Sequence, residues 1–153
     1  MSSLGTPFFV DRFIKVYTLI IMSDIIQNAV YVPSQRTYYV SANRHDFVAF
    51  TVGSEEHFID GGTDYLRASF LLPYNKIVDY SLTSSNTLKE IREKLLWGTY
   101  GKSGNKPLKW VPFRNLSVDH LAAIICHKGA APNAIRMDAA EYWYGVKKIF
   151  FIP

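Results

Sequence analysis

The hydrophobic pattern of this 153-residue chain changes its period near residue 85, and this change constrains the fold more than any other feature. Residues 25–82 contain short runs of β-branched and aromatic residues that end at glycine, proline or serine, which is typical of strands joined by short turns. Residues 87–148 carry apolar residues at three- and four-residue spacing, which is typical of helices. The sequence therefore predicts an α+β fold, with a mostly antiparallel sheet in the N-terminal half and about three helices in the C-terminal half.

The first half contains five predicted strands, at 25–32, 37–40, 46–52, 57–60 and 76–82. The third run, DFVAFTV, is apolar at nearly every position, which predicts a central strand covered on both faces. Turn residues at 53–56 follow it, so we expect the third and fourth strands to form a hairpin.

Three helices are predicted in the second half. Thr87 and Glu90 have the spacing of a capping box, in front of a helix that includes Leu95 and Leu96. Ser117 can cap a second helix. A third helix is predicted over 132–148, and a short strand over 108–113.

Residues 25–153 are predicted to form a single domain, since a chain of this length can bury its own core. Residues 1–24 are predicted to be an N-terminal extension, in which Met22 is an alternative start and residues 1–21 are dispensable. The longest uncharged run there, 16–22, is much shorter than the roughly 20 residues of a membrane span. We therefore expect no membrane association.

The formal net charge of +4 is unevenly distributed along the chain. Residues 1–85 hold six Lys/Arg and eight Asp/Glu, whereas residues 86–153 hold eleven and five. An excess of positive charge can attract nucleic acid, anionic nucleotides or an acidic protein surface. An ordinary solvated surface is the alternative interpretation.

Cysteine and glycine motifs exclude some classes of site. The single cysteine, Cys126, lies in an apolar run, which predicts a buried thiol. One cysteine and four dispersed histidines provide no zinc spacing, so neither metal nor cofactor is expected. The sequence Gly-Lys-Ser at 101–103 is no phosphate-binding loop, because the first glycine of that motif falls on Leu96. We expect a flexible hairpin loop there.

Two short polar runs, 44–46 and 60–67, would meet if the predicted hairpin forms. Their arginines and carboxylates can bind a polar or anionic ligand, and their glycines allow close approach of a ligand. Alternatively, His45 acts as an acid or base with carboxylate partners, or the runs form an internal ion-pair network. The candidate ligand-binding residues are Arg44, His45, Asp46, Asp60, Gly61, Gly62, Asp64, Tyr65 and Arg67, and the candidate catalytic residues are His45, Asp46, Asp60 and Asp64.

A second candidate surface lies in the basic half. Aromatic residues interleaved with cations can stack on bases and hold phosphates, although large aromatic residues more often belong to a core. The candidate nucleic-acid-binding residues are Lys102, Lys106, Lys109, Arg114 and Trp110, with Trp97, Tyr100 and Phe113 nearby.

Three motifs, RHDFV at 44–48, IDGGTDYLR at 59–67 and WGTYGKSGNKPLKWVPFRNLSVDHLAAI at 97–124, resemble a family of small, largely uncharacterised tailed-phage proteins. The family pattern is RHDFV…VDGGxDYLRR…WGTYGKxGxxPLxWVPLxxLxxDHLxAI, and the resemblance covers about residues 25–126. The chain departs from it at Ala68, where a second arginine is usual, and it lacks a cysteine pair that some relatives carry. The resemblance implies phage origin, a location in the cytoplasm of the infected bacterium and a non-virion accessory role, but no established activity.

Three functional hypotheses follow. The favoured one is an accessory protein without catalytic activity that uses the 44–67 residues to bind a host protein or a small anionic ligand, and so modulates host defence or metabolism. The second is a small nucleotide- or nucleic-acid-processing enzyme that uses His45 with the nearby carboxylates. The third is a nucleic-acid-binding protein that uses the basic C-terminal half. The sequence leaves the oligomeric state open.

Overall fold

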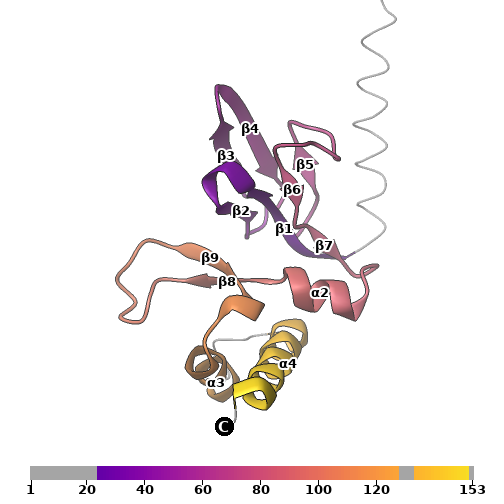
Figure 1. Ribbon diagram of the computed structural model, residues 1–153. Helices are drawn as coiled ribbons and strands as arrows, with labels where there is room; N and C mark the ends of the chain where they lie inside the picture. The colour runs from indigo at the N-terminus through magenta and orange to yellow at the C-terminus, as the bar shows by residue number, and fades with distance from the viewer. Residues whose placement is uncertain (1–23, 128–132, 152–153) are drawn as a thin grey trace, which may run out of the picture. The chain divides into compact units, whose positions relative to one another are not determined.

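The computed structural model describes residues 24–127 and 133–151 and confirms the α+β prediction (Figure 1). The chain divides into two compact units, one ending at Ser85 and the other beginning at Asn86. The single-domain prediction for 25–153 stays a prediction, and the predicted extension lies outside the described residues except for Asp24.

Two antiparallel sheets form the N-terminal unit. In the first, β1 (Ile25–Val32) pairs with β2 (Thr37–Ser41) and with the short strands β6 (Val78–Asp79) and β7 (Leu82–Thr83). The 3-10 turn η1 (Pro33–Gln35) joins β1 to β2. The second sheet is a meander of β3 (Val48–Val52), β4 (Glu55–Asp60) and β5 (Arg67–Ala68). The predicted strand at 76–82 is therefore two short strands.

The predicted hairpin forms, but β3 is covered on one face only. Phe50 and Val52 are buried, whereas Ala49 and Thr51 are exposed, so the prediction of a strand covered on both faces was wrong. The strand is also an edge strand of its sheet rather than a central one. Only the face that carries Phe50 and Val52 packs against the core.

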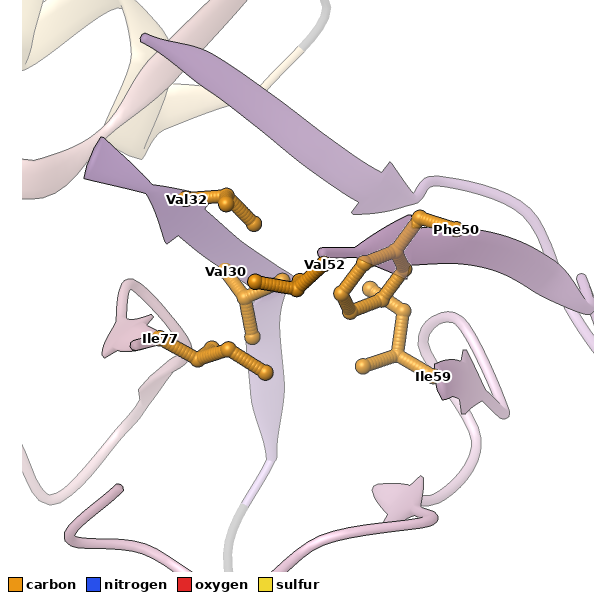
Figure 2. Packing of buried hydrophobic residues seen from close by; sticks show 6 residues of the cluster. All are labelled: Val30, Val32, Phe50, Val52, Ile59 and Ile77. Atoms are coloured by element: carbon orange, nitrogen blue, oxygen red, sulfur yellow. The ribbon is translucent and has the colours of Figure 1, made fainter. Parts of the chain in front are cut away.

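The hydrophobic core of this unit joins its two sheets (Figure 2). Figure 2 shows that β1, β3, β4 and the segment before β6 each contribute side chains to it: Val30, Val32, Phe50, Val52, Ile59 and Ile77. Each is at most 6% exposed. Burying a side chain of this size contributes about 1.5–3 kcal/mol, so this cluster is the main source of stability that holds the hairpin β3–β4 against β1.

The C-terminal unit contains a two-stranded sheet and three helices. Its elements are α2 (Leu88–Lys94), β8 (Leu96–Thr99), β9 (Lys109–Pro112), the 3-10 turn η2 (Phe113–Asn115), α3 (Val118–Cys126) and α4 (Ala134–Phe151). Both predicted caps are present: Thr87 and Glu90 form the capping box, and the hydroxyl of Ser117 accepts a hydrogen bond from the backbone N–H of His120. None of the helices in the described ranges combines the length and hydropathy that a membrane span requires.

Two predictions for this unit were wrong. The first helix ends at Lys94, and Leu96 begins strand β8, because Leu95 has an extended backbone (φ −64°, ψ 133°). Both Leu95 and Leu96 are fully buried on either side of this break. Cys126 is exposed rather than buried, because the buried face of α3 is defined by Leu121 and Ile124.

Candidate functional site

The two polar runs of the N-terminal unit converge, because β3 and β4 are paired from Val48 opposite Ile59 to Val52 opposite Glu55. The start of β3 therefore lies beside the end of β4. Arg44 Nε lies 2.6 Å from Asp64 Oδ2, and His45 Nε2 lies 3.3 Å from the same oxygen. We call these residues, 44–46 and 60–67, the polar cluster.

Backbone packing holds the two runs of the polar cluster together. Gly62 has a φ of +56°, and a Cβ atom placed on it would lie 1.4 Å from the carbonyl oxygen of Asn43. Only glycine therefore permits this approach of the two loops. Ser41 Oγ then bridges them: it accepts a hydrogen bond from the N–H of Gly62 at 2.9 Å and donates one to the carbonyl of Asp46 at 2.5 Å.

Each carboxylate of the polar cluster has a partner in the N-terminal unit. Asp60, whose side chain is 6% exposed, lies 2.7 Å from Arg67 Nη2 and accepts a hydrogen bond from the Tyr65 hydroxyl at 3.3 Å. Asp64 is paired with Arg44, and Asp46 Oδ2 accepts the N–H of Ala42 at 3.2 Å. A buried carboxylate needs such a partner to remain charged, so this arrangement accounts for the cluster as an internal network that stabilises two loops.

His45 satisfies part of the geometry that an acid–base role requires. Its Nε2 is within reach of Asp64, and its Nδ1 lies 3.5 Å from the Tyr65 hydroxyl. Its ring is 59% exposed. Within the part of the chain that the structure describes, His45 contacts no serine, threonine or cysteine hydroxyl or thiol. The catalytic roles of His45, Asp46, Asp60 and Asp64 stay predictions.

The cations of the C-terminal unit are arranged differently. No Asp or Glu occurs between residues 94 and 118. This stretch folds into the hairpin of β8 and β9, with Leu96 paired to Pro112 and Thr99 to Lys109. The four predicted cations of the hairpin region are exposed, and none forms an ion pair with a described residue: Lys102, Lys106, Lys109 and Arg114. We call residues 96–114 the basic hairpin.

The aromatic residues of the basic hairpin have different surroundings. Trp97 packs edge-on against Phe113 with ring centroids 5.6 Å apart, and Phe113 is fully buried. Trp110 covers Gly98, where an added Cβ would lie 3.1 Å from the indole ring. Tyr100, in contrast, is 54% exposed. The predicted residue Trp110 therefore supports the hairpin, and Tyr100 is the aromatic side chain available for stacking.

A further polar group, not predicted from the sequence, lies in the same unit as the polar cluster. Residues from β3 and β4, together with the residue before β3 and the residue after β5, line a groove of about 450 Å3: Phe47, Ala49, Phe50, Thr51, Glu56, His57, Phe58 and Ser69. His57 and Ser69 are hydrogen-bonded to each other there. Ser69 lies twelve positions after His57, and the pairing of β4 with β5 brings the two together. Among the residues described, no group of three or more histidine, cysteine, aspartate or glutamate side chains is arranged to hold a metal ion.

The fold and these surfaces define an α+β protein with two charged regions. The arginines of the polar cluster are paired with carboxylates, whereas the four cations of the basic hairpin have no ion-pair partner among the described residues. Comparison with known proteins adds nothing further, since no family model, no curated protein and no solved structure matches the chain.

Proposed function

We propose that this is a nucleic-acid-binding protein and that the basic hairpin is its binding surface. The observation that carries the proposal is the contrast between the two charged regions. Arg44 and Arg67 are each within 2.7 Å of a carboxylate, whereas the cations of the basic hairpin have no such partner in the described structure. Exposed like charges repel one another, so a surface that keeps them together is suited to an external polyanion.

The shape of the hairpin supports the same proposal. A two-stranded antiparallel ribbon can enter the major groove of duplex DNA, and exposed aromatic residues can stack on unpaired bases. The side chain of Lys106 lies across Gly101, where an added Cβ would be 2.9 Å from Lys106 Cδ. The N–H of Lys106 also donates to the carbonyl of Tyr100 at 2.8 Å. The connection between the strands thus presents its lysines from a defined backbone.

The resemblance to tailed-phage proteins supports an accessory role for such a protein inside an infected bacterium. The first hypothesis, a host protein or small anionic ligand bound by the polar cluster, receives less support from the geometry. A ligand carboxylate or phosphate would have to displace Asp64 from Arg44 or Asp60 from Arg67. The same argument applies to an enzyme that relies on His45, because Asp64 also holds Arg44.

Salt-dependent binding tests the proposal. Fluorescence anisotropy with a labelled 20-base-pair DNA duplex and a labelled 20-nucleotide single strand should show affinity that falls steeply with salt. If all four cations of the basic hairpin contact duplex phosphates, the slope of log K against log salt should approach about −3.6, or roughly −0.9 for each contact. The double variant Lys102→Ala/Lys106→Ala should reduce the slope by about 1.8.

A matched variant controls for net charge. Lys76→Ala/Lys89→Ala removes the same charge from exposed lysines outside the hairpin and should leave the slope unchanged. Affinity for both probes that does not vary with salt, or equal losses in the two double variants, would contradict the basic hairpin as the binding surface.

A further inference from the structure

Glu55, His57 and Ser69 form a hydrogen-bonded series in the N-terminal unit. His57 Nε2 lies 3.3 Å from Glu55 Oε2, and His57 Nδ1 lies 3.4 Å from Ser69 Oγ. The carboxylate can only accept, so the hydrogen bond to Glu55 places the imidazole proton on Nε2. The lone pair of Nδ1 then faces the serine hydroxyl.

The surroundings of Ser69 determine which way its hydroxyl proton points. Ser69 Oγ accepts a hydrogen bond from the backbone N–H of Phe58 at 3.0 Å. The proton of the hydroxyl is therefore free to be donated to Nδ1 of His57. The N–H of Phe58 also favours negative charge on Oγ, as a hydrogen bond to a charged form does generally.

Two neighbours keep the Glu55 carboxylate ionised. Its Oε2 accepts a hydrogen bond from the Tyr74 hydroxyl at 2.6 Å, and Lys76 Nζ lies 3.8 Å from Oε1. The hydrogen bond from Tyr74, followed by the charge of Lys76, lowers the pKa of Glu55 below its ordinary value. The His57 ring is further held between aromatic residues, with centroids 5.6 Å from Phe70 and 5.7 Å from Tyr74.

We propose that Ser69 is an activated nucleophile, with His57 as its general base and Glu55 as the residue that positions His57, and that the site accepts small acyl esters with an apolar group. An ordered nucleophile, base and orienting carboxylate is the arrangement that activates a serine. Distances slightly longer than ideal are common before substrate binds. The groove volume of about 450 Å3 falls in the range of small-molecule sites.

The chemistry of the step is acyl transfer. Ser69 Oγ bonds to the ester carbonyl carbon while its proton moves to His57 Nδ1. The bond from this carbon to the leaving alkoxide then breaks, and the leaving group takes the proton from Nδ1. Water next attacks the acyl-serine by the same route, which releases a carboxylic acid and restores the hydroxyl. Phe47 is 57% exposed, is stacked on Phe58 at 4.9 Å, and lines the same groove as Ser69. This aromatic pair provides the apolar contact for the acyl or leaving group.

Covalent labelling of the full chain tests this proposal. Phenylmethanesulfonyl fluoride transfers its sulfonyl group to an activated serine and releases fluoride, and its phenyl ring suits the groove. Peptide mapping by mass spectrometry should find the adduct on Ser69 of the folded wild-type protein and not on Ser103, an exposed serine outside the series. Labelling carried out in urea should give no adduct, because His57 no longer faces Ser69 in the unfolded chain.

Variants and turnover distinguish activation from simple exposure. His57→Gln should slow the labelling of Ser69 by about 100-fold or more, as expected for loss of general-base assistance, and Glu55→Gln should slow it by a smaller factor. Release of 4-nitrophenol from 4-nitrophenyl acetate should fall to background in Ser69→Ala and stay unchanged in His120→Gln. A folded wild-type protein that shows no adduct on Ser69, or labels Ser69 no faster than Ser103, overturns the proposal. Equal labelling in wild type and His57→Gln does so as well.

Discussion

Replacement of Gly62 by alanine is the most direct test of how the polar cluster is built. Gly62 has a φ of +56°, a left-handed conformation that costs a residue with a Cβ about 1–2 kcal/mol. The new Cβ would also lie 1.4 Å from the carbonyl oxygen and 2.3 Å from the carbonyl carbon of Asn43. Both atoms belong to backbone, so the loops must move apart, and overpacking of this kind typically costs about 1–3 kcal/mol. We expect Gly62→Ala to destabilise the N-terminal unit by about 2–5 kcal/mol.

Gly53 offers a matched control in the same unit. Its φ is +63°, but nothing lies within 4 Å of an added Cβ. Gly53→Ala should therefore lose only the conformational part, about 1–2 kcal/mol. The difference between the two variants isolates the contact with Asn43.

Hydrogen exchange read by NMR at the amides of β1 and β4 measures this difference. A gap of about 1–3 kcal/mol corresponds to roughly 5- to 150-fold faster exchange in Gly62→Ala than in Gly53→Ala. If the two variants exchange at the same rate, the loop at Asn43 does not lie against Gly62, and this contact does not hold the two runs of the polar cluster together.

Two further predictions concern the C-terminal unit. Thr87→Ala should destabilise this unit by about 1 kcal/mol, because it removes the oxygen that caps α2, whereas Thr87→Ser should retain stability. Urea titration followed by tryptophan fluorescence measures both, since Trp97, Trp110 and Trp143 all lie in this unit. An equal loss of stability in the two variants would exclude capping as the cause. The bidentate hydrogen bonds from Arg92, at 2.8 and 2.9 Å, lower the pKa of Asp138 below its ordinary 3.8. The ionised pair therefore stabilises the folded state above about pH 3.8, and this stabilisation is lost as the pH falls through the lower folded-state pKa. Asp138→Asn should therefore flatten the acid side of the stability–pH curve, and an unchanged acid limb would show that the pair contributes nothing.

Local patterns in the sequence predicted much of the fold. The bounds of β1 were predicted residue for residue, because an eight-residue run rich in β-branched side chains ends directly at a proline. The two helix caps were predicted for the same reason, since a cap depends on residues three apart in the chain. Features decided by such short spacings can be read without knowing how distant segments pack.

Features that depend on the packing of distant segments were harder to predict from the sequence. Leu95 and Leu96 continue a helical pattern in sequence, yet the chain turns extended at Leu95, where the N–H of Phe113 donates to its carbonyl at 3.0 Å. The partner of that hydrogen bond is eighteen positions away. Cys126 lies in an apolar run, but the side of α3 that is covered depends on the position of α4. In both places, distant contacts override a local preference that is weak by itself.

The candidate sites also differ in whether short sequence spacings or distant packing contacts determine them. Convergence of the two polar runs followed from a hairpin whose turn was recognisable, so the residues of the polar cluster could be gathered from sequence. The series of Glu55, His57 and Ser69 could not, because it depends on β5, a strand of only two residues. Strand alternation does contain a partial clue: Glu55 and His57 are two apart and therefore point to the same face of β4.

Charge illustrates most clearly what structure adds to sequence. Arg44, Arg67 and the lysines of the basic hairpin are all single cations among polar and aromatic neighbours, and sequence analysis assigned ligand binding first to the arginines. The ion pairs of the two arginines support the opposite order, which is the one we propose. A guanidinium already 2.6 Å from a carboxylate gains little from a new anion, since it must first give up the existing pair, and replacement of one exposed pair by another is worth at most about 1 kcal/mol. An unpaired lysine gives up only water and counterions, whose release favours binding to a polyanion. Cations without a partner in the described structure are therefore better suited to a polyanion than Arg44 and Arg67, and the basic hairpin gathers four of them.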